Sequence, residues 1–382
     1  MIWFSLFIPF LLSCVFFVWY KDKMGSYHKM ETSEYLCIFV VPTIFIALIM
    51  LTMFGIMISN NTDDIEYLSY HYTKIRHEDA WNERVWVTKY RTVRDADGNK
   101  HEESYCVQET KYHPEEWYGY LNNESKHSLC LDEYNTIKKS WNVPENCIDM
   151  HRDYYTIDGD AQEHIWDINR KTIKTYVKEH HYTNKIIGSQ SAFKFNEIKT
   201  EEAKELGLYD YPCIKRHEQN PIIGYTRFVR KDNVNKFKML NAFYGYNKQI
   251  CFYLLIYPNT SASIVEDQRS YWQGGNKNEF VICVGIDSLT NKVQWSQCFS
   301  WLDDITMEVE CRNFINNQNK LDINSLGDWL EKHLHLWKRK EFNDFNYLNV
   351  DLTDGQEIAI LWTVIILSVL MGVIAYFVIE NK

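Results

Sequence analysis

The sequence contains little glycine and proline, with 15 and 7 residues in a chain of 382. Disordered chains and long linkers are normally richer in both residues, so most of this chain is expected to fold. Positive charge is also scarce, because 41 Lys and Arg stand against 51 Asp and Glu and give a net charge of −10. Nucleic-acid binding needs a basic surface that displaces counterions. We therefore expect no nucleic-acid partner.

No familiar catalytic motif is present either. The chain has no GxSxG, HExxH or kinase-type pattern. The pair Gly274-Gly275 closes a helical stretch and precedes an apolar one, which is the reverse of the order in a phosphate-binding loop. No CxxC pair occurs, so a zinc ribbon or a thioredoxin-type redox pair is not supported. The sequence predicts no cofactor and favours a non-enzymatic protein.

Ten cysteines are present. Cysteine in an apolar strand acts as a small hydrophobic residue, and this applies to Cys251, Cys283 and Cys298. If the region lies outside the cytoplasm, where disulfides persist, the candidates for pairing are Cys106, Cys130 and Cys147.

Three long runs without a charged residue predict transmembrane helices over residues 1–20, 36–58 and 358–379. Each is long enough for a hydrocarbon core about 30 Å thick. The first run has no basic start and no small-residue cleavage site, so an uncleaved span is favoured over a signal peptide. None of the runs contains an ionisable residue of the kind that lines an ion or proton path. The spans are therefore predicted to be anchors in the lipid bilayer.

The orientation follows from the short basic loop 21–35, which carries Lys21, Lys23 and Lys29. Lysines near the ends of membrane spans mark the cytoplasmic side. This predicts a plasma-membrane protein with residues 60–355 outside the cytoplasm. Lys338-Arg339-Lys340, near the last span, favours the opposite orientation.

Residues 59–224 are expected to form a β-hairpin and helical subdomain. Two alternating runs, 85–93 and 101–112, flank the dipeptide Asp97-Gly98, and Asp-Gly in this position is the strongest short-range signal of a hairpin. The other predicted elements are a juxtamembrane helix or connector over 59–81 and helices over 130–141, 161–182 and 200–208.

Residues 225–345 are expected to form a mixed α/β subdomain. Apolar runs at 251–257 and 280–286 enclose an amphipathic helix over 261–272, which is the pattern of a parallel strand–helix–strand unit. A third strand, antiparallel to its neighbour, is predicted at 292–300, with covering helices at 305–316 and 323–337. The predicted fold class is an α+β, or mixed α/β, soluble domain with three transmembrane helices.

The order of elements from Cys251 to Gln318 resembles the membrane-anchored TPM domain family. That resemblance implies a mixed sheet between helices, and a role as a phosphatase or as an assembly factor for membrane complexes. The anchors and the segment Tyr271–Glu279, YWQGGNKNE, are also similar to those of uncharacterised membrane proteins of tailed phages.

Carboxylates near the predicted strand ends are the candidate site residues, because ligands of α/β sheets bind at such ends. Solvated loop carboxylates are the alternative. The leading hypothesis is a membrane-anchored accessory or interaction protein that presents its acidic domain to a protein partner, with the oligomeric state left open. The alternative is a membrane-bound, phosphatase-like hydrolase that uses a divalent metal. The carboxylates concerned are Asp287, Asp303 and Asp304, with Asp267 and Glu279 nearby.

Overall fold

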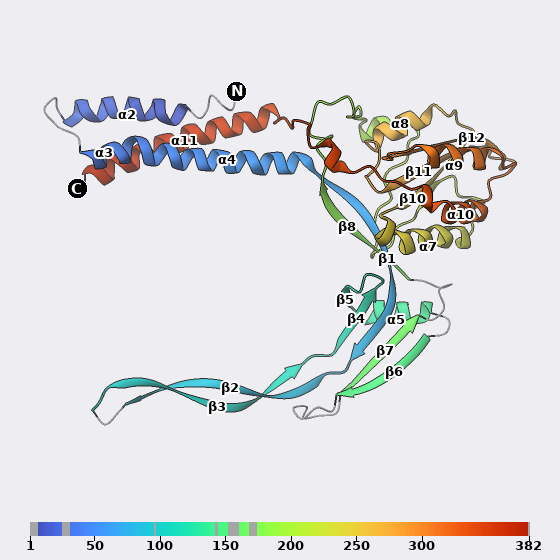
Figure 1. Ribbon diagram of the computed structural model, residues 1–382, viewed down its shortest axis with the longest axis horizontal. Helices are drawn as coiled ribbons and strands as arrows, with labels where there is room; N and C mark the ends of the chain where they lie inside the picture. Colours follow the sequence, from blue (N-terminus) through green and yellow to red (C-terminus); the bar gives the residue numbers. More distant parts are fainter. Residues whose placement is uncertain are drawn as a thin grey trace. The chain divides into compact units, whose positions relative to one another are not determined.

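The computed structural model describes residues 7–24, 31–94, 97–141, 144–151, 160–167 and 174–380. The chain is a mixed α+β protein that divides into two compact units (Figure 1). The first unit comprises Met1–Ile65, His181–Asn196 and Lys340–Lys382, and the second comprises Glu66–His180 and Glu197–Arg339.

The first unit is built from apolar helices. Two of them are long and apolar enough to cross a membrane, the continuous helix Thr32–Thr62 and the helix Asp354–Glu380. They pack on each other through a cluster that includes Ile46, Met50 and Ile360. The helical elements are α2 (Ile8–Met24), α3 (Thr32–Tyr35), the π-helical turn η1 (Leu36–Val40), α4 (Val41–Thr62), the 3-10 turn η3 (Phe342–Phe345) and α11 (Asp354–Glu380).

The sequence predicted three membrane helices, whereas the structure supports two. The helix in the first predicted span, α2, has 17 described residues, and its last turn carries Lys21 and Lys23. Residues 1–6 of that span lie outside the described part of the chain. The described helix is therefore shorter than the other two, which have 31 and 27 residues.

The second unit contains a six-stranded sheet in the order β5-β4-β1-β7-β6, with β8 also paired to β1. The helix α5 (Leu131–Ser140) contributes Tyr134 and Ile137 to a core that it shares with Ile75 and Ile165 of the sheet. The strands are β1 (Asp63–Glu78), β4 (Glu116–Leu121), β5 (Lys126–Leu129), β6 (Pro144–His151), β7 (Asp160–Asp167) and β8 (Thr175–Thr183).

Two predictions for this region were wrong. Residues 59–81 were expected to be a helix or connector, but most of them form β1, the central strand. Residues 161–182 were expected to be helical, but their described parts belong to β7 and β8. Of the apolar residues that gave the helical spacing, Ile165, Tyr176 and Val177 are buried on these strands, and Ile168 and Ile173 lie outside the described residues. Pairing with distant strands then overrides local preference.

The second unit also contains a four-stranded sheet in the order β12-β11-β10-β9. The predicted strand–helix–strand unit is confirmed, because β10 and β11 pair in parallel from Cys251↔Glu279 to Pro258↔Ile286, and β12 pairs antiparallel to β11. The short β9 pairs with β10, so this sheet begins before the boundary predicted at residue 224. The elements are α7 (Lys231–Lys248), α8 (Ile264–Tyr271), α9 (Thr306–Asn316), α10 (Ile323–Lys332), the 3-10 turn η2 (Leu334–Leu336), β9 (Ile222–Gly224), β10 (Cys251–Pro258), β11 (Glu279–Ile286) and β12 (Val293–Ser300).

Helices cover both faces of this sheet. Phe252, Leu254 and Ile256 of β10 share one core with residues of α7, α9 and α10. The alternate β10 residues share a second core with residues of α8 and of α6 (Thr200–Leu206). Because both faces are buried, β10 and β11 are continuously apolar, as is usual for parallel strands.

Candidate interaction surface on the hairpin arm

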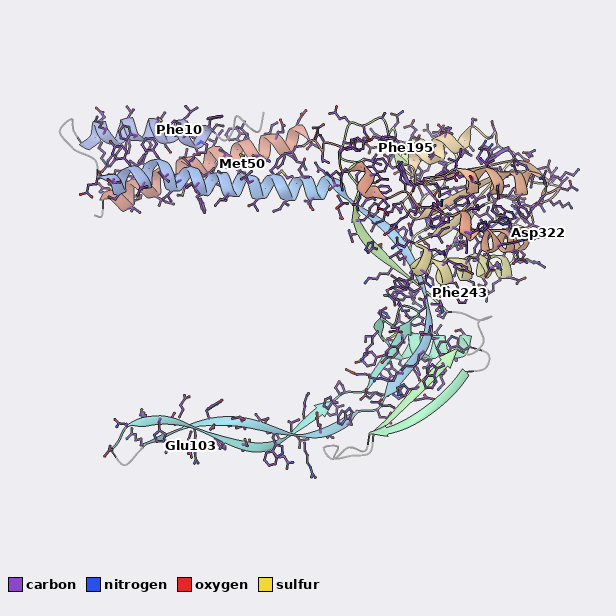
Figure 2. All side chains as sticks on the ribbon, viewed as in Figure 1. Phe10, Met50, Glu103, Phe195, Phe243 and Asp322 are labelled. Carbon is purple, nitrogen blue, oxygen red and sulfur yellow. The ribbon has the colours of Figure 1, made fainter. Side chains whose placement is uncertain are left out.

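The predicted hairpin is confirmed and is much longer than an ordinary surface turn. Strands β2 (Trp81–Arg94) and β3 (Lys100–His113) pair without interruption from Trp81↔His113 to Arg94↔Lys100. We call these two strands the arm. Among the described residues no third strand pairs with them. Figure 1 shows the arm as a twisted ribbon, and in Figure 2 its side chains, Glu103 among them, project from both faces.

One face of the arm carries paired charges, and we call it the ion-pair face. Arg91 donates two hydrogen bonds to Oε2 of Glu103, at 3.0 Å from Nε and 2.7 Å from Nη2. Lys89 forms an ion pair with Glu109. Four half-buried valines lie on the same face. Cross-strand pairs of this kind stabilise a ribbon that has no core of its own. The valines are Val85, Val87, Val93 and Val107.

The opposite face carries exposed aromatic side chains, and we call it the aromatic face. Trp86, Tyr90 and Tyr112 are 65%, 69% and 63% exposed. Tyr112 pairs with Asn82, so the three aromatic positions follow one another at intervals of about 13 Å along the ribbon. Large aromatic side chains bury 150–250 Å² each when covered, so this face leaves much apolar area in water.

The charge of the aromatic face also differs from that of the whole chain. It carries three cationic side chains and one carboxylate, whereas the chain has a net charge of −10. Trp, Tyr and Arg are the residues most enriched at the energetic centres of protein interfaces. The members of the face are Asn82, Arg84, Trp86, Thr88, Tyr90, Thr92 and Arg94 of β2 and Lys100, Glu102, Ser104, Cys106, Gln108, Thr110 and Tyr112 of β3.

The carboxylate of Asp287 stabilises the turn between β11 and β12. It accepts hydrogen bonds from the backbone N–H of Leu289 at 3.0 Å and of Thr290 at 2.7 Å, and from the Thr290 hydroxyl at 2.8 Å. These bonds, those from Thr290 foremost, hold the pKa of Asp287 below its usual value. The arrangement is an Asx-type turn.

Asp303 and Asp304 follow β12 and precede α9. Asp304 accepts hydrogen bonds from the hydroxyl of Thr306 at 2.6 Å and from its backbone N–H at 2.9 Å, and these bonds lower its pKa. The Asp303 backbone N–H donates to the carbonyl of Lys338. Since β12 runs antiparallel to β11, these two residues lie at the other end of β11 from Asp287, about 25 Å away. The structure therefore does not bring the three carboxylates together.

Glu279 and Asp267 have separate surroundings. The fully buried Glu279 accepts hydrogen bonds from the backbone and side-chain nitrogens of Asn276 and from the Tyr211 hydroxyl. It thereby holds the turn after α8, where Gly274 and Gly275 have φ of +86° and +77°. Asp267 lies exposed in the first turn of α8. The glycine pair is thus a helix stop, as predicted.

Glu308 on α9 is a carboxyl group that the sequence did not single out. Burial raises the pKa of Glu308 to about 7 from its ordinary value of 4.5. A burial-induced shift cannot be recognised in sequence, because Glu308 looks like any residue in the first turn of an amphipathic helix.

Glu308 should make stability depend on pH. The folded state holds the proton more tightly than the unfolded state, so its contribution is complete below pH 4.5 and is lost as the pH rises to about 7. We expect this loss to be about 2 kcal/mol for a partly buried group. Glu308→Gln should remove that part of the slope, measured as the difference between the variant and the wild type in urea unfolding at pH 5 and pH 8. Equal slopes would contradict the assignment.

A cavity of about 500 Å³ lies between α5, the start of β8 and the loop at residues 215–218. Its lining includes Lys174, Arg216 and His217, but Glu133 and Glu218 as well. Glu218 is paired with Lys174 inside the protein. The cavity therefore presents no clear excess of charge to a ligand.

The cysteines are free thiols wherever their side chains are described. Cys251 and Cys283 are fully buried on β10 and β11, as predicted, and burial raises the pKa of both thiols. Cys106 and Cys130 are exposed. A disulfide between Cys106 and Cys130, one of the predicted pairings, is therefore not formed, and the side chain of Cys147 lies outside the described part of the structure.

No family model, curated protein or solved structure gave a match to this chain. The resemblance to the TPM domain family therefore stays a prediction, as does the hydrolase alternative.

Proposed function

We propose that the protein is a membrane-anchored interaction protein whose arm binds a protein partner through the aromatic face. The observation that carries the proposal is the exposure of Trp86, Tyr90 and Tyr112 on one face of an otherwise hydrophilic ribbon. The partner's matching surface would be acidic and would hold pockets for aromatic side chains, since the face combines these residues with Arg84 and Arg94.

The energetics of the arm support this role. A two-stranded ribbon is marginally stable in water when nothing covers it. Natural proteins usually protect or shorten an exposed edge strand, because it can pair with other chains. Here 14 residues on each strand are left without a third strand among the described residues. A partner that covers the aromatic face would supply the burial that the ribbon lacks.

The anchoring part of the proposal depends on the two long apolar helices, Thr32–Thr62 and Asp354–Glu380. We propose that the first charge-free run of the sequence, which contains most of α2, is a third span. Lys21 and Lys23 in the last turn of α2 and Lys29 after it support a cytoplasmic position for this end of the helix. This orientation would place the arm outside the cytoplasm of the cell that carries the protein.

One experiment tests both the orientation and the binding face. Cys106 is a native thiol on the aromatic face, and Tyr105 lies beside it on the ion-pair face. Cells would express the full chain with Ser at Cys130, Cys147 and Cys213, and be treated with a membrane-impermeant, thiol-reactive photo-crosslinker. The matched control carries Cys106→Ser and Tyr105→Cys in the same background.

We expect both chains to be labelled in intact cells and only the Cys106 chain to crosslink to a discrete protein. Labelling that requires permeabilised cells would overturn the orientation, and the crosslinking would then be repeated in those cells. Equal crosslinks from both faces, or none from Cys106, would refute the binding face. Crosslinks from Cys106 to lipid alone would replace the protein partner with the membrane surface.

A further inference from the structure

The joint between the arm and the six-stranded sheet has an unusual set of opposed residues. The β1–β4 ladder ends with His77↔Trp117 and Glu78↔Glu116, and the arm begins with Trp81↔His113 in the same register. Between these two ladders, residues 79–80 on one side and residues 114–115 on the other belong to no strand. The common register places Asp79 opposite Glu115, and places Pro114, which has no N–H to donate, opposite Ala80. Like charges opposite each other destabilise a sheet.

A histidine completes a group of three metal-ligating side chains at this joint. Nε2 of His77 lies 2.8 Å from Oε1 of Glu115 and 3.6 Å from Oδ1 of Asp79. One ligand atom from each residue falls within 4.8 Å of the other two. Donors around a tetrahedral cation with bonds of 2.0–2.1 Å are about 3.3 Å apart, so small side-chain rotations would bring all three into contact with one ion.

The histidine ring is held in position by its neighbours. His77 stacks on Trp117 with a centroid distance of 5.5 Å and an interplanar angle of 3°. Its side chain is 23% exposed, against 50% for Asp79 and 48% for Glu115. The ring is thus the fixed ligand, and the two carboxylates remain accessible from water and free to adjust.

We propose that His77, Asp79 and Glu115 form a binding site for one divalent transition cation of the Zn²⁺ type. One imidazole nitrogen and two carboxylate oxygens suit such an ion better than Mg²⁺ or Ca²⁺, which prefer oxygen ligands alone. Three protein ligands leave a position for water. The ion would also neutralise the two opposed carboxylates. This site is independent of whether the aromatic face binds a partner.

Binding at this position would stiffen the joint. Asp79 lies on the connection from β1 to β2, and Glu115 lies on the connection from β3 to β4. An ion held by both residues and by His77 would link the two connections at the break in the ladder between Glu78↔Glu116 and Trp81↔His113. The arm would then be fixed to the sheet when the ion is bound and freer when it is absent.

The chain provides a matched control within the same ribbon. His113 contacts Glu83 at 2.9 Å and stacks on Trp81 with a centroid distance of 4.2 Å. It therefore repeats the stacked histidine and one carboxylate of the joint, and it belongs to no three-ligand group among the described residues.

The test uses the full, tag-free chain in detergent micelles, titrated with Co²⁺ and Zn²⁺. We expect the wild type to bind one Co²⁺ with a visible d–d absorption that Zn²⁺ displaces and that a large excess of Mg²⁺ does not. His77→Gln, Asp79→Asn and Glu115→Gln should each weaken binding at least about tenfold, whereas His113→Gln should leave it within about twofold.

Hydrogen exchange gives a second measurement. If His77 had only a structural role, adding Zn²⁺ would not change exchange at the joint. Zn²⁺ should slow exchange on the order of tenfold at residues 79–81 and 113–116 in the wild type and in His113→Gln, but not in His77→Gln. The absence of the d–d band, equal losses for His77→Gln and His113→Gln, or Zn²⁺-independent exchange at the joint would each overturn the proposal.

Discussion

Replacing Glu66 with alanine should lower the free energy of unfolding of the second unit by roughly 3–5 kcal/mol. Glu66 lies on β1, and its side chain is only 2% exposed. Its Oε1 lies 3.2 Å from Nζ of Lys277 and 2.8 Å from Nδ1 of His180, and its Oε2 lies 3.7 Å from Arg339. Removing the carboxylate takes the common counter-charge from two cations that are themselves largely buried.

The expected size of this effect follows from burial. The side chains of Lys277 and Arg339 are 13% and 22% exposed, so water screens them far less than it screens a surface pair. The carboxylate also joins β1 to segments beside the four-stranded sheet, where Asn278 donates a hydrogen bond to the carbonyl of Tyr67 at 2.8 Å. Its loss therefore weakens the contact between the two sheets of this unit.

Urea unfolding of the full chain in detergent, followed by tryptophan fluorescence, would measure the change. Glu103→Ala is the matched control, because its ion pair with Arg91 is 50–62% exposed and should be worth less than about 1 kcal/mol. Glu66→Gln keeps the size of the side chain and should fall between the two. If Glu66→Ala behaved like Glu103→Ala, the buried carboxylate would not be a determinant of stability.

Local signals in the sequence were sufficient for part of the fold. The hairpin was predictable because Asp97-Gly98 lies between two alternating runs, and Gly98 does adopt a positive φ of 85°. The unit from β10 to β11 was predictable because both strands are buried on both faces and are therefore continuously apolar. These elements depend on the residues immediately around them.

The six-stranded sheet was not predictable in the same way. Strand β1 pairs with β4, β7 and β8, which come from positions far along the chain, and its own pattern of buried residues is irregular. A strand whose pairing changes along its length does not show a clean alternation of apolar and polar residues. Only the partner strands reveal that residues 63–78 are extended.

The candidate sites also differ in whether local sequence or the pairing of distant strands determines them. The aromatic face could have been found from sequence, because the hairpin register implied by the turn places Trp86, Tyr90 and Tyr112 on one side. The metal-ligating group at the joint could not have been found from sequence, since the opposition of Asp79 and Glu115 depends on the pairing of β1 with β4. The placement of Asp303 and Asp304 depended on the direction of β12, which the sequence predicted without showing its consequence for the site.

Replacing both Trp86 and Tyr90 with serine should weaken partner binding by at least about a hundredfold. Truncation of an interface Trp or Tyr commonly costs about 2 kcal/mol or more when the residue is an anchor, and about 1.4 kcal/mol corresponds to a tenfold change in affinity. Both side chains are about two-thirds exposed, so their loss should change the stability of the arm by less than about 1 kcal/mol. Binding and folding are therefore separable here.

The measurement is the dissociation constant of the full chain in detergent for the protein captured by crosslinking at Cys106. The control replaces Lys89 and Tyr105, a cross-strand pair on the ion-pair face, and should change the affinity less than about threefold. The affinity of the wild type should also fall as salt is raised, because Arg84 and Arg94 would face acidic groups. An equal loss for both double variants would mean that binding depends on the folding of the ribbon and not on its aromatic face.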